Sequence, residues 1–148
     1  MRVLVAGSRS LPSGTAPRAL LTFLARLPPD CPVLLRAPVS GHSGRFEEDV
    51  EAVCRILSVP VEWRRPNLAE THGRASVYAR DIGMVEDADL VVLFLDGRDA
   101  EEGYSGTYHL YERALEADRP LYVWRVDTGV YTRWGEHDPD HLYASMFS

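Results

Sequence analysis

The sequence contains no lysine: all 16 basic residues are arginines, and 22 Asp and Glu side chains outnumber them, giving a formal net charge of −6. Proteins that bind long nucleic acids need a basic surface that displaces counterions from phosphates, so nucleic acid is not expected as a ligand. The missing lysine also excludes a Walker-type phosphate loop. A small phosphate-bearing molecule is compatible with this composition, because a few backbone N–H groups and one arginine suffice to bind it.

The sequence is also poor in cysteine and lacks long apolar runs. Two cysteines, Cys31 and Cys54, are too few for a disulfide framework, and their apolar neighbours predict reduced core thiols. No run reaches the ~20 apolar residues of a membrane helix, and the first apolar run ends at Gly7, too early for a signal peptide. No Ser-His-Asp or nucleophile-elbow arrangement is visible. We therefore expect a cytoplasmic protein that does not bind membranes.

Short apolar runs alternate with amphipathic helical patterns along the chain. The runs predict strands at residues 2–6, 33–36, 59–63, 89–95 and 121–126. The patterns predict helices from an N-cap at Thr15 to Pro28, over residues 46–57, from a cap at about Thr71 to Glu86, and from Gly106 onward, with a long acidic loop after Asp96. This alternation predicts an α/β domain over residues 1–126. We expect a Rossmann-like, doubly wound parallel sheet of five strands in the order 3-2-1-4-5, with helices on both faces.

Residues 127–148 do not continue the alternation, and they mix aromatic side chains with acids and histidines. We predict a C-terminal tail that packs on its own domain or on a partner subunit. The segment from Glu136 to His141 has metal-ligand side chains, but Pro139 prevents a helix that would align its two histidines. We interpret this segment as a solvated acidic loop and expect no metal site.

Three predicted loops carry small residues and hydrogen-bond donors. In a parallel sheet, the loops after strands 1, 2 and 4 open on the carboxyl edge, near the switch point where ligands bind. Glycine permits a close approach of the backbone, and helix N-termini supply oriented N–H groups. The predicted ligand-binding residues are Gly7, Ser8, Arg9 and Ser10 after strand 1, Ser40, Gly41, His42, Ser43 and Gly44 after strand 2, and Ser105, Gly106 and Thr107 after strand 4. For each loop taken alone, the alternative interpretation is that its small residues form a turn and bind no ligand.

The stretches VLVAGSRS, PVSGHSG, HGRASVYARDIGMVEDADLVVLFLDG and SGT, in this order over residues 1–126, resemble the SLOG superfamily. This superfamily contains the Rossmann-like SMF/DprA and LOG proteins, and the similarity is to its small bacterial and phage YspA/YpsA-like branch. The resemblance implies that the loops bind a nucleotide or a nucleotide-derived molecule such as an ADP-ribose, with no cofactor required. The matching positions are Gly7, Ser8, Arg9, Gly41, Gly44, Arg80, Gly106 and Thr107.

The chain departs from the LOG enzymes, which cleave ribose phosphate from a nucleotide base. The helix motif of these enzymes contains an arginine and a lysine. In this chain the arginine is present as Arg80, but the lysine is absent, and Leu110 stands at the position of the catalytic glutamate. Glu112 follows two residues later, about 200° around the helix. In the YspA/YpsA-like branch an Asp often follows the second-loop glycines; here Phe46 takes that position, with Glu47 next to it. An enzyme of this kind would be a nucleotide N-glycosidase or phosphoribohydrolase with Glu47 or Glu112 as its acid or base.

The helix that carries Arg80 has an apolar stripe. The residues predicted to face the core are Ala75, Tyr78, Ala79 and Ile82. This places Arg80 nearly opposite, on a face that it shares with Val77 and Met84. The resemblance to LOG-like homodimers implies that this far face packs on a second subunit and presents Arg80 to the site. An exposed arginine without that role is the alternative.

Together, the three loops and the resemblance to the SLOG superfamily imply a protein that binds a nucleotide or a nucleotide-derived small molecule as a homodimer. Arg9 and Arg80 would oppose the phosphate charge. Enzymatic cleavage of the nucleotide is the alternative. A DprA-like partner of single-stranded DNA is a third class, which the acidic balance disfavours.

Overall fold

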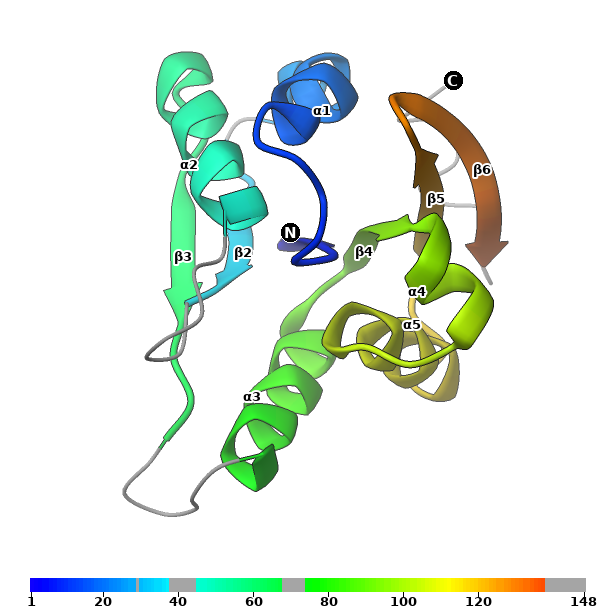
Figure 1. The fold of residues 1–148 in the computed structure, drawn as a ribbon. Coiled ribbons are helices and arrows are strands. Elements are labelled where there is room, and N and C mark those ends of the chain that lie inside the picture. The colour runs from blue at the N-terminus through cyan, green and yellow to red at the C-terminus, as the bar shows by residue number, and fades with distance from the viewer. Residues whose placement is uncertain (29, 38–44, 68–73, 138–148) are drawn as a thin grey trace.

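The computed structural model describes residues 1–28, 30–37, 45–67 and 74–137. These residues have an α/β fold, in which one mixed sheet of six strands carries helices on both faces (Figure 1). The strands are β1 (Val3–Gly7), β2 (Val33–Arg36), β3 (Val61–Arg64), β4 (Leu90–Asp96), β5 (Leu121–Asp127) and β6 (Val130–His137). The helices are α1 (Thr15–Ala25), α2 (Arg45–Leu57), α3 (Arg74–Asp87), α4 (Gly97–Glu102) and α5 (Gly106–Glu116).

The strands lie in the order β3-β2-β1-β4-β5-β6. The first five pair in parallel and follow the predicted order. The prediction of a wholly parallel sheet of five strands is wrong, because β6 pairs antiparallel with β5. Thr128 and Gly129 connect these two strands with φ angles of 45° and 82°. Positive φ at both central residues is the geometry of a two-residue hairpin turn.

The hairpin also changes the description of the C-terminal segment. Residues 130–137, which we predicted as part of a tail outside the regular alternation, form β6 at the edge of the sheet. The remaining residues, 138–148, lie outside the described part of the chain, as does most of the segment that we interpreted as a solvated acidic loop.

The core lies on both faces of the sheet, because alternate residues of a strand point to opposite sides. Val3 and Val5 of β1 belong to a buried cluster with α1 and α2, whereas Leu4 and Ala6 pack with α3, α4 and α5. All but the last residue of β4 is buried, as its continuous apolar run predicts. Both cysteines are buried, as predicted. In the described ranges, no helix combines the length and the apolar character needed to cross a membrane.

The helices differ from the prediction in two places. Gly14, not Thr15, is the N-cap of α1, with a φ of 90°, and Thr15 is already helical. Residues 97–102, predicted as part of a loop, form α4, because the Asp96 side chain caps this helix and accepts a hydrogen bond from the Asp99 N–H at 2.7 Å. The start of α5 at Gly106 is as predicted. The predicted cap of α3, Thr71, lies outside the described residues.

The buried face of α3 is opposite to the predicted one. The buried residues are Ser76, Asp81, Met84 and Val85, and the exposed ones include Ala75, Tyr78, Ala79 and Ile82. Arg80 turns inward, with only 6% of its side chain exposed, and pairs with Asp81. The prediction from hydrophobic periodicity is wrong here because a hydrogen-bonded ion pair, rather than the apolar stripe, faces the protein interior.

Candidate functional site at the carboxyl edge of the sheet

Arg36, the last residue of β2, joins three other segments of the chain. Its Nη2 donates to the Gly7 carbonyl oxygen at 3.0 Å, to Glu47 Oε1 at 2.7 Å and to Thr107 Oγ1 at 3.0 Å. Its Nε donates to the same Glu47 oxygen at 3.1 Å. The ends of β1 and β2 and the starts of α2 and α5 therefore meet within the reach of one guanidinium group.

The Arg36–Glu47 pair is buried, with 13% and 5% of the two side chains exposed. Burial by itself disfavours the arginine charge, but the carboxylates of Glu47 and Asp81 outweigh it and raise the pKa of Arg36. Arg36 is therefore charged at every physiological pH. Its hydrogen bonds hold the side chains of Glu47 and Thr107 in fixed positions.

A second ion pair, between Arg80 and Asp81, lies at the same edge. Arg80 Nε donates to Asp81 Oδ1 at 3.0 Å, and Nη1 donates to the carbonyl oxygens of Ala37 at 2.9 Å and Arg64 at 3.5 Å. Burial lowers the pKa of Arg80 and raises that of Asp81, even though each partner opposes the shift of the other. Oδ2 of Asp81 is buried and has no hydrogen-bond partner among the described residues. Arg80 thus ties α3 to the chain just after β2 and to the end of β3.

The start of α5 presents backbone N–H donors. Ser105 is the N-cap, and its Oγ accepts a hydrogen bond from the Tyr108 N–H at 3.0 Å. The first N–H groups of a helix have no partner within the helix, and those of Gly106 and Thr107 have no acceptor in the part of the chain that the structure describes. Gly106 is exposed, whereas the Thr107 side chain is buried against Arg36. An anion at Gly106 would therefore meet two N–H groups and the positive end of the helix dipole.

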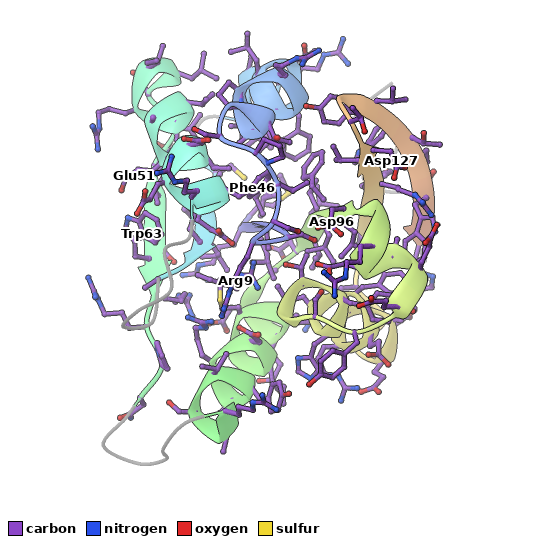
Figure 2. The ribbon with its side chains drawn as sticks, in the orientation of Figure 1. Arg9, Phe46, Glu51, Trp63, Asp96 and Asp127 are labelled. Carbon is purple, nitrogen blue, oxygen red and sulfur yellow. The ribbon has the colours of Figure 1, made fainter. Side chains whose placement is uncertain are left out.

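The loop after β1 contributes packing as well as donors. A Cβ atom on Gly7 would lie 2.6 Å from the Phe46 ring, so the glycine is explained by this contact rather than by a ligand. Ser8 is buried, and its Oγ accepts a hydrogen bond from the Asp96 N–H at 3.1 Å, which ties β1 to β4. Arg9 and Ser10 are exposed. Figure 2 shows Arg9 on the loop after β1 and Phe46 on the first turn of α2.

The structure gathers some of the predicted site residues and separates others. Gly7, Glu47 and Thr107 meet at Arg36. Glu112 is exposed on α5, about 140° around the helix from Thr107, and is not brought to this cluster. The residues Ser40, Gly41, His42, Ser43 and Gly44 lie outside the described residues.

Arg36 and Asp81 were not among the predicted site residues. For Arg36 the sequence does contain a signal, because an arginine ends an otherwise apolar strand directly before the glycine-rich loop. Asp81 gives no comparable signal, since its burial depends on the inward turn of α3. In the described ranges, no group of three or more His, Cys, Asp or Glu side chains is placed to hold a metal ion.

Comparisons of the chain with protein-family models, with curated proteins and with solved structures give no match.

Proposed function

We propose that this protein binds a nucleotide or a nucleotide-derived small molecule at the carboxyl edge of its sheet. One observation carries the proposal: Arg36 brings the end of β1 and the start of α5 together beside Glu47. These are two of the three predicted binding loops, and they converge as a shared site requires. The strand order reverses between β1 and β4, which is where a Rossmann-like sheet binds its ligand.

The phosphate lies at the start of α5 in this proposal, on the N–H groups of Gly106 and Thr107. Arg9 is exposed and without an ion-pair partner among the described residues, so it supplies the mobile positive charge. Arg80 is hydrogen-bonded through Nε and Nη1, and no hydrogen bond of Nη2 is found within the described residues, so we assign Nη2 to the ligand. Arg36 is a positioning residue, because it fixes the Thr107 side chain and with it the first turn of α5.

Calorimetric titration with nucleoside mono- and diphosphates, ADP-ribose and cyclic ADP-ribose tests this function. Loss of one charge-assisted contact in Arg9→Ala is expected to weaken binding about tenfold. Arg55→Ala is the matched control, because Arg55 is an exposed arginine in the last turn of α2. If none of these compounds binds at concentrations up to about 1 mM, the proposed function is wrong.

A nucleotide N-glycosidase or phosphoribohydrolase is a second candidate, and the burial of Glu47 at this edge is the observation that favours it. Arg36 occupies Oε1 of Glu47, and no hydrogen bond of Oε2 is found within the described residues, so Oε2 is available to a water or a ribose hydroxyl. Release of free base from nucleoside monophosphates is the assay. We expect Glu47→Gln to abolish release and Glu112→Gln, on the exposed face of α5, to retain it. No release by the unmodified protein would leave binding as the function.

The proposed homodimer is assigned to a different face of α3 from the one we predicted. Tyr78 and Ile82, each 40% exposed, lie on the outer side of this helix, whereas Arg80 points inward. Light scattering after size-exclusion chromatography is expected to give a dimer for the unmodified chain and a monomer for Ile82→Glu. A monomer in both samples would contradict the dimer without affecting the binding proposal.

A further inference from the structure

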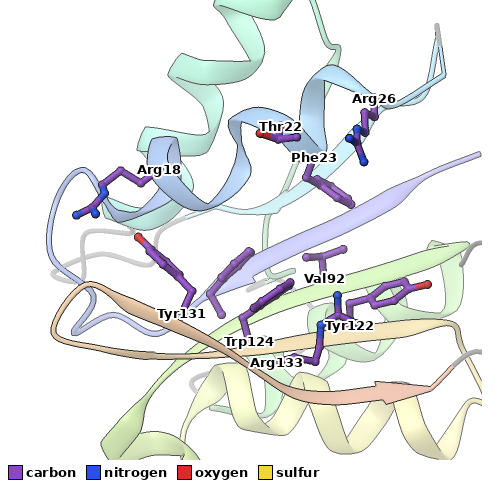
Figure 3. A pocket seen from close by; sticks show the side chains of 10 residues that line it. Arg18, Thr22, Phe23, Arg26, Val92, Tyr122, Trp124, Tyr131 and Arg133 are labelled. Atoms are coloured by element: carbon purple, nitrogen blue, oxygen red, sulfur yellow. The ribbon is translucent and has the colours of Figure 1, made fainter. Parts of the chain in front are cut away.

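The sheet face that carries α1 and α2 has an open region next to α1. These two helices pack on each other, and α2 packs on β1, while the β5–β6 hairpin extends the sheet beyond α1 (Figure 3). A cavity of about 300 Å³ lies between α1 and this hairpin. Binding sites for small molecules begin at about this volume.

Aromatic rings form the walls of this cavity. Phe23 comes from α1, Trp124 from β5 and Tyr131 from β6 (Figure 3), and Phe94 of β4 lines it as well. The Tyr131 hydroxyl donates a hydrogen bond to the Thr15 carbonyl oxygen at 3.3 Å, which ties the hairpin to the start of α1. Flat apolar walls of this kind pack best against a flat ring, because aromatic pairs gain stacking in addition to buried area.

The charged side chains that line the cavity are all positive. They are Arg18, Arg26 and Arg133, and none of the described lining residues is an Asp or a Glu. Arg133 stacks over the Trp124 ring at 4.4 Å and donates to Glu136 at 2.9 Å, so its charge is already partnered. Arg18 is exposed and has no ion-pair partner within the described residues. Arg18 is therefore the lining side chain that we assign to the negative charge of a ligand.

We propose that the cavity binds a small aromatic anion, a planar ring that carries one carboxylate or phosphate group. The ring stacks against Trp124 and Tyr131, and the anionic group pairs with Arg18. The ligand needs both the ring and the charge, because the ring stacks on the aromatic walls and the negative group forms an ion pair with the arginine. The site is separate from the carboxyl-edge cluster, because none of Gly7, Glu47 and Thr107, which meet at Arg36, lines the cavity.

Calorimetric titration of the full chain with matched probes tests this site. The probes are 1-naphthoate and 1-naphthyl phosphate, with neutral 1-naphthamide and non-aromatic cyclohexanecarboxylate as controls. Both aromatic anions are expected to bind at least about tenfold more tightly than either control. Arg18→Gln and Trp124→Leu are each expected to weaken the anions about tenfold. Arg98→Gln, which removes an exposed arginine from α4, is expected to leave binding unchanged.

Three results would overturn the assignment. The first is that no aromatic anion binds at about 1 mM, and the second is that 1-naphthamide binds as tightly as 1-naphthoate. The third is an NMR spectrum of the full chain with contacts between residues 138–148 and the Trp124 ring that the probes do not displace. In that case the chain's own C-terminal segment, not a ligand, occupies the cavity. Binding of the aromatic anions that Arg18→Gln and Trp124→Leu both weaken confirms the site.

Discussion

Arg36→Met tests whether one buried cation holds the carboxyl edge together. Methionine keeps most of the length of the side chain but removes its charge and all of its donors. Glu47, with 5% of its side chain exposed, would lose its cation, and the Gly7 carbonyl and the Thr107 hydroxyl would each lose a donor. Removing one partner of a buried ion pair costs about 3–5 kcal/mol of unfolding free energy, a large share of the roughly 5–15 kcal/mol that stabilises a domain.

The double variant Arg36→Met/Glu47→Leu separates the charge from the packing. Replacing both members of a buried pair with apolar residues is often close to neutral. The double variant is therefore expected to lose only about 1–2 kcal/mol, for the Gly7 carbonyl and the Thr107 hydroxyl that remain without a donor. Urea unfolding followed by circular dichroism measures all four proteins of this double-mutant cycle. If Arg36→Met does not fold, Arg36→Lys replaces it, since lysine keeps the charge but loses the fork of donors.

The cycle should give a coupling energy between the two positions of about 2 kcal/mol or more. Additive losses, or a cost of Arg36→Met below about 1 kcal/mol, would place the pair among solvent-screened surface contacts. The three segments would then be held by other contacts, and the convergence at Arg36 would not explain the site.

Three further predictions concern packing, thiol chemistry and pH. Gly7→Ala is expected to destabilise the fold by about 1–3 kcal/mol, because its Cβ would lie 2.6 Å from the Phe46 ring. In urea unfolding, adding Phe46→Leu to this variant should restore most of the lost stability. Burial raises the pKa of Cys54 to about 11 and also raises the pKa of Cys31. Ellman's reagent at about pH 8 should therefore modify neither thiol until denaturant is added. Rapid reaction of the folded protein would contradict the burial of the two thiols. Burial raises the pKa of Asp81 above 3.8, so its contribution to stability is present at low pH and is lost as the pH rises through the folded-state value. The stability of Asp81→Asn relative to the unmodified chain should therefore increase from about pH 4 upward, and a difference that stays constant with pH would be inconsistent with this titration.

The five parallel strands were predictable because their apolar runs are continuous and the chain alternates regularly between strand and helix. β6 was missed because it is an edge strand with mixed exposure, and its residues alternate only weakly between apolar and polar. The turn at Thr128-Gly129 was the available signal, since a glycine between two short runs favours a hairpin.

The candidate site was predictable only in part. The meeting of the end of β1 with the start of α5 followed from the fold, because parallel strands bring their carboxyl ends to one edge. Which face of α3 is buried could not be predicted from the fold. Its apolar stripe has helical periodicity but lies on the exposed side, and it consists of Ala75, Tyr78, Ala79 and Ile82. Whether Arg80 turns inward depends on an acceptor at Ala37, which is distant in the sequence. Contacts of this kind, including those of Arg36, are set by tertiary structure and leave no periodic pattern.

Titration of the unmodified chain with nucleotides, while the backbone amide signals of Gly106 and Thr107 are followed by NMR, tests the central proposal most directly. We expect at least one nucleotide or ADP-ribose compound to bind, with its largest shifts at these two amides and with affinity that Arg9→Ala reduces. Binding that shifts only residues on the α1 face, or no shift at either amide with any compound, would contradict the assignment of a phosphate to the start of α5.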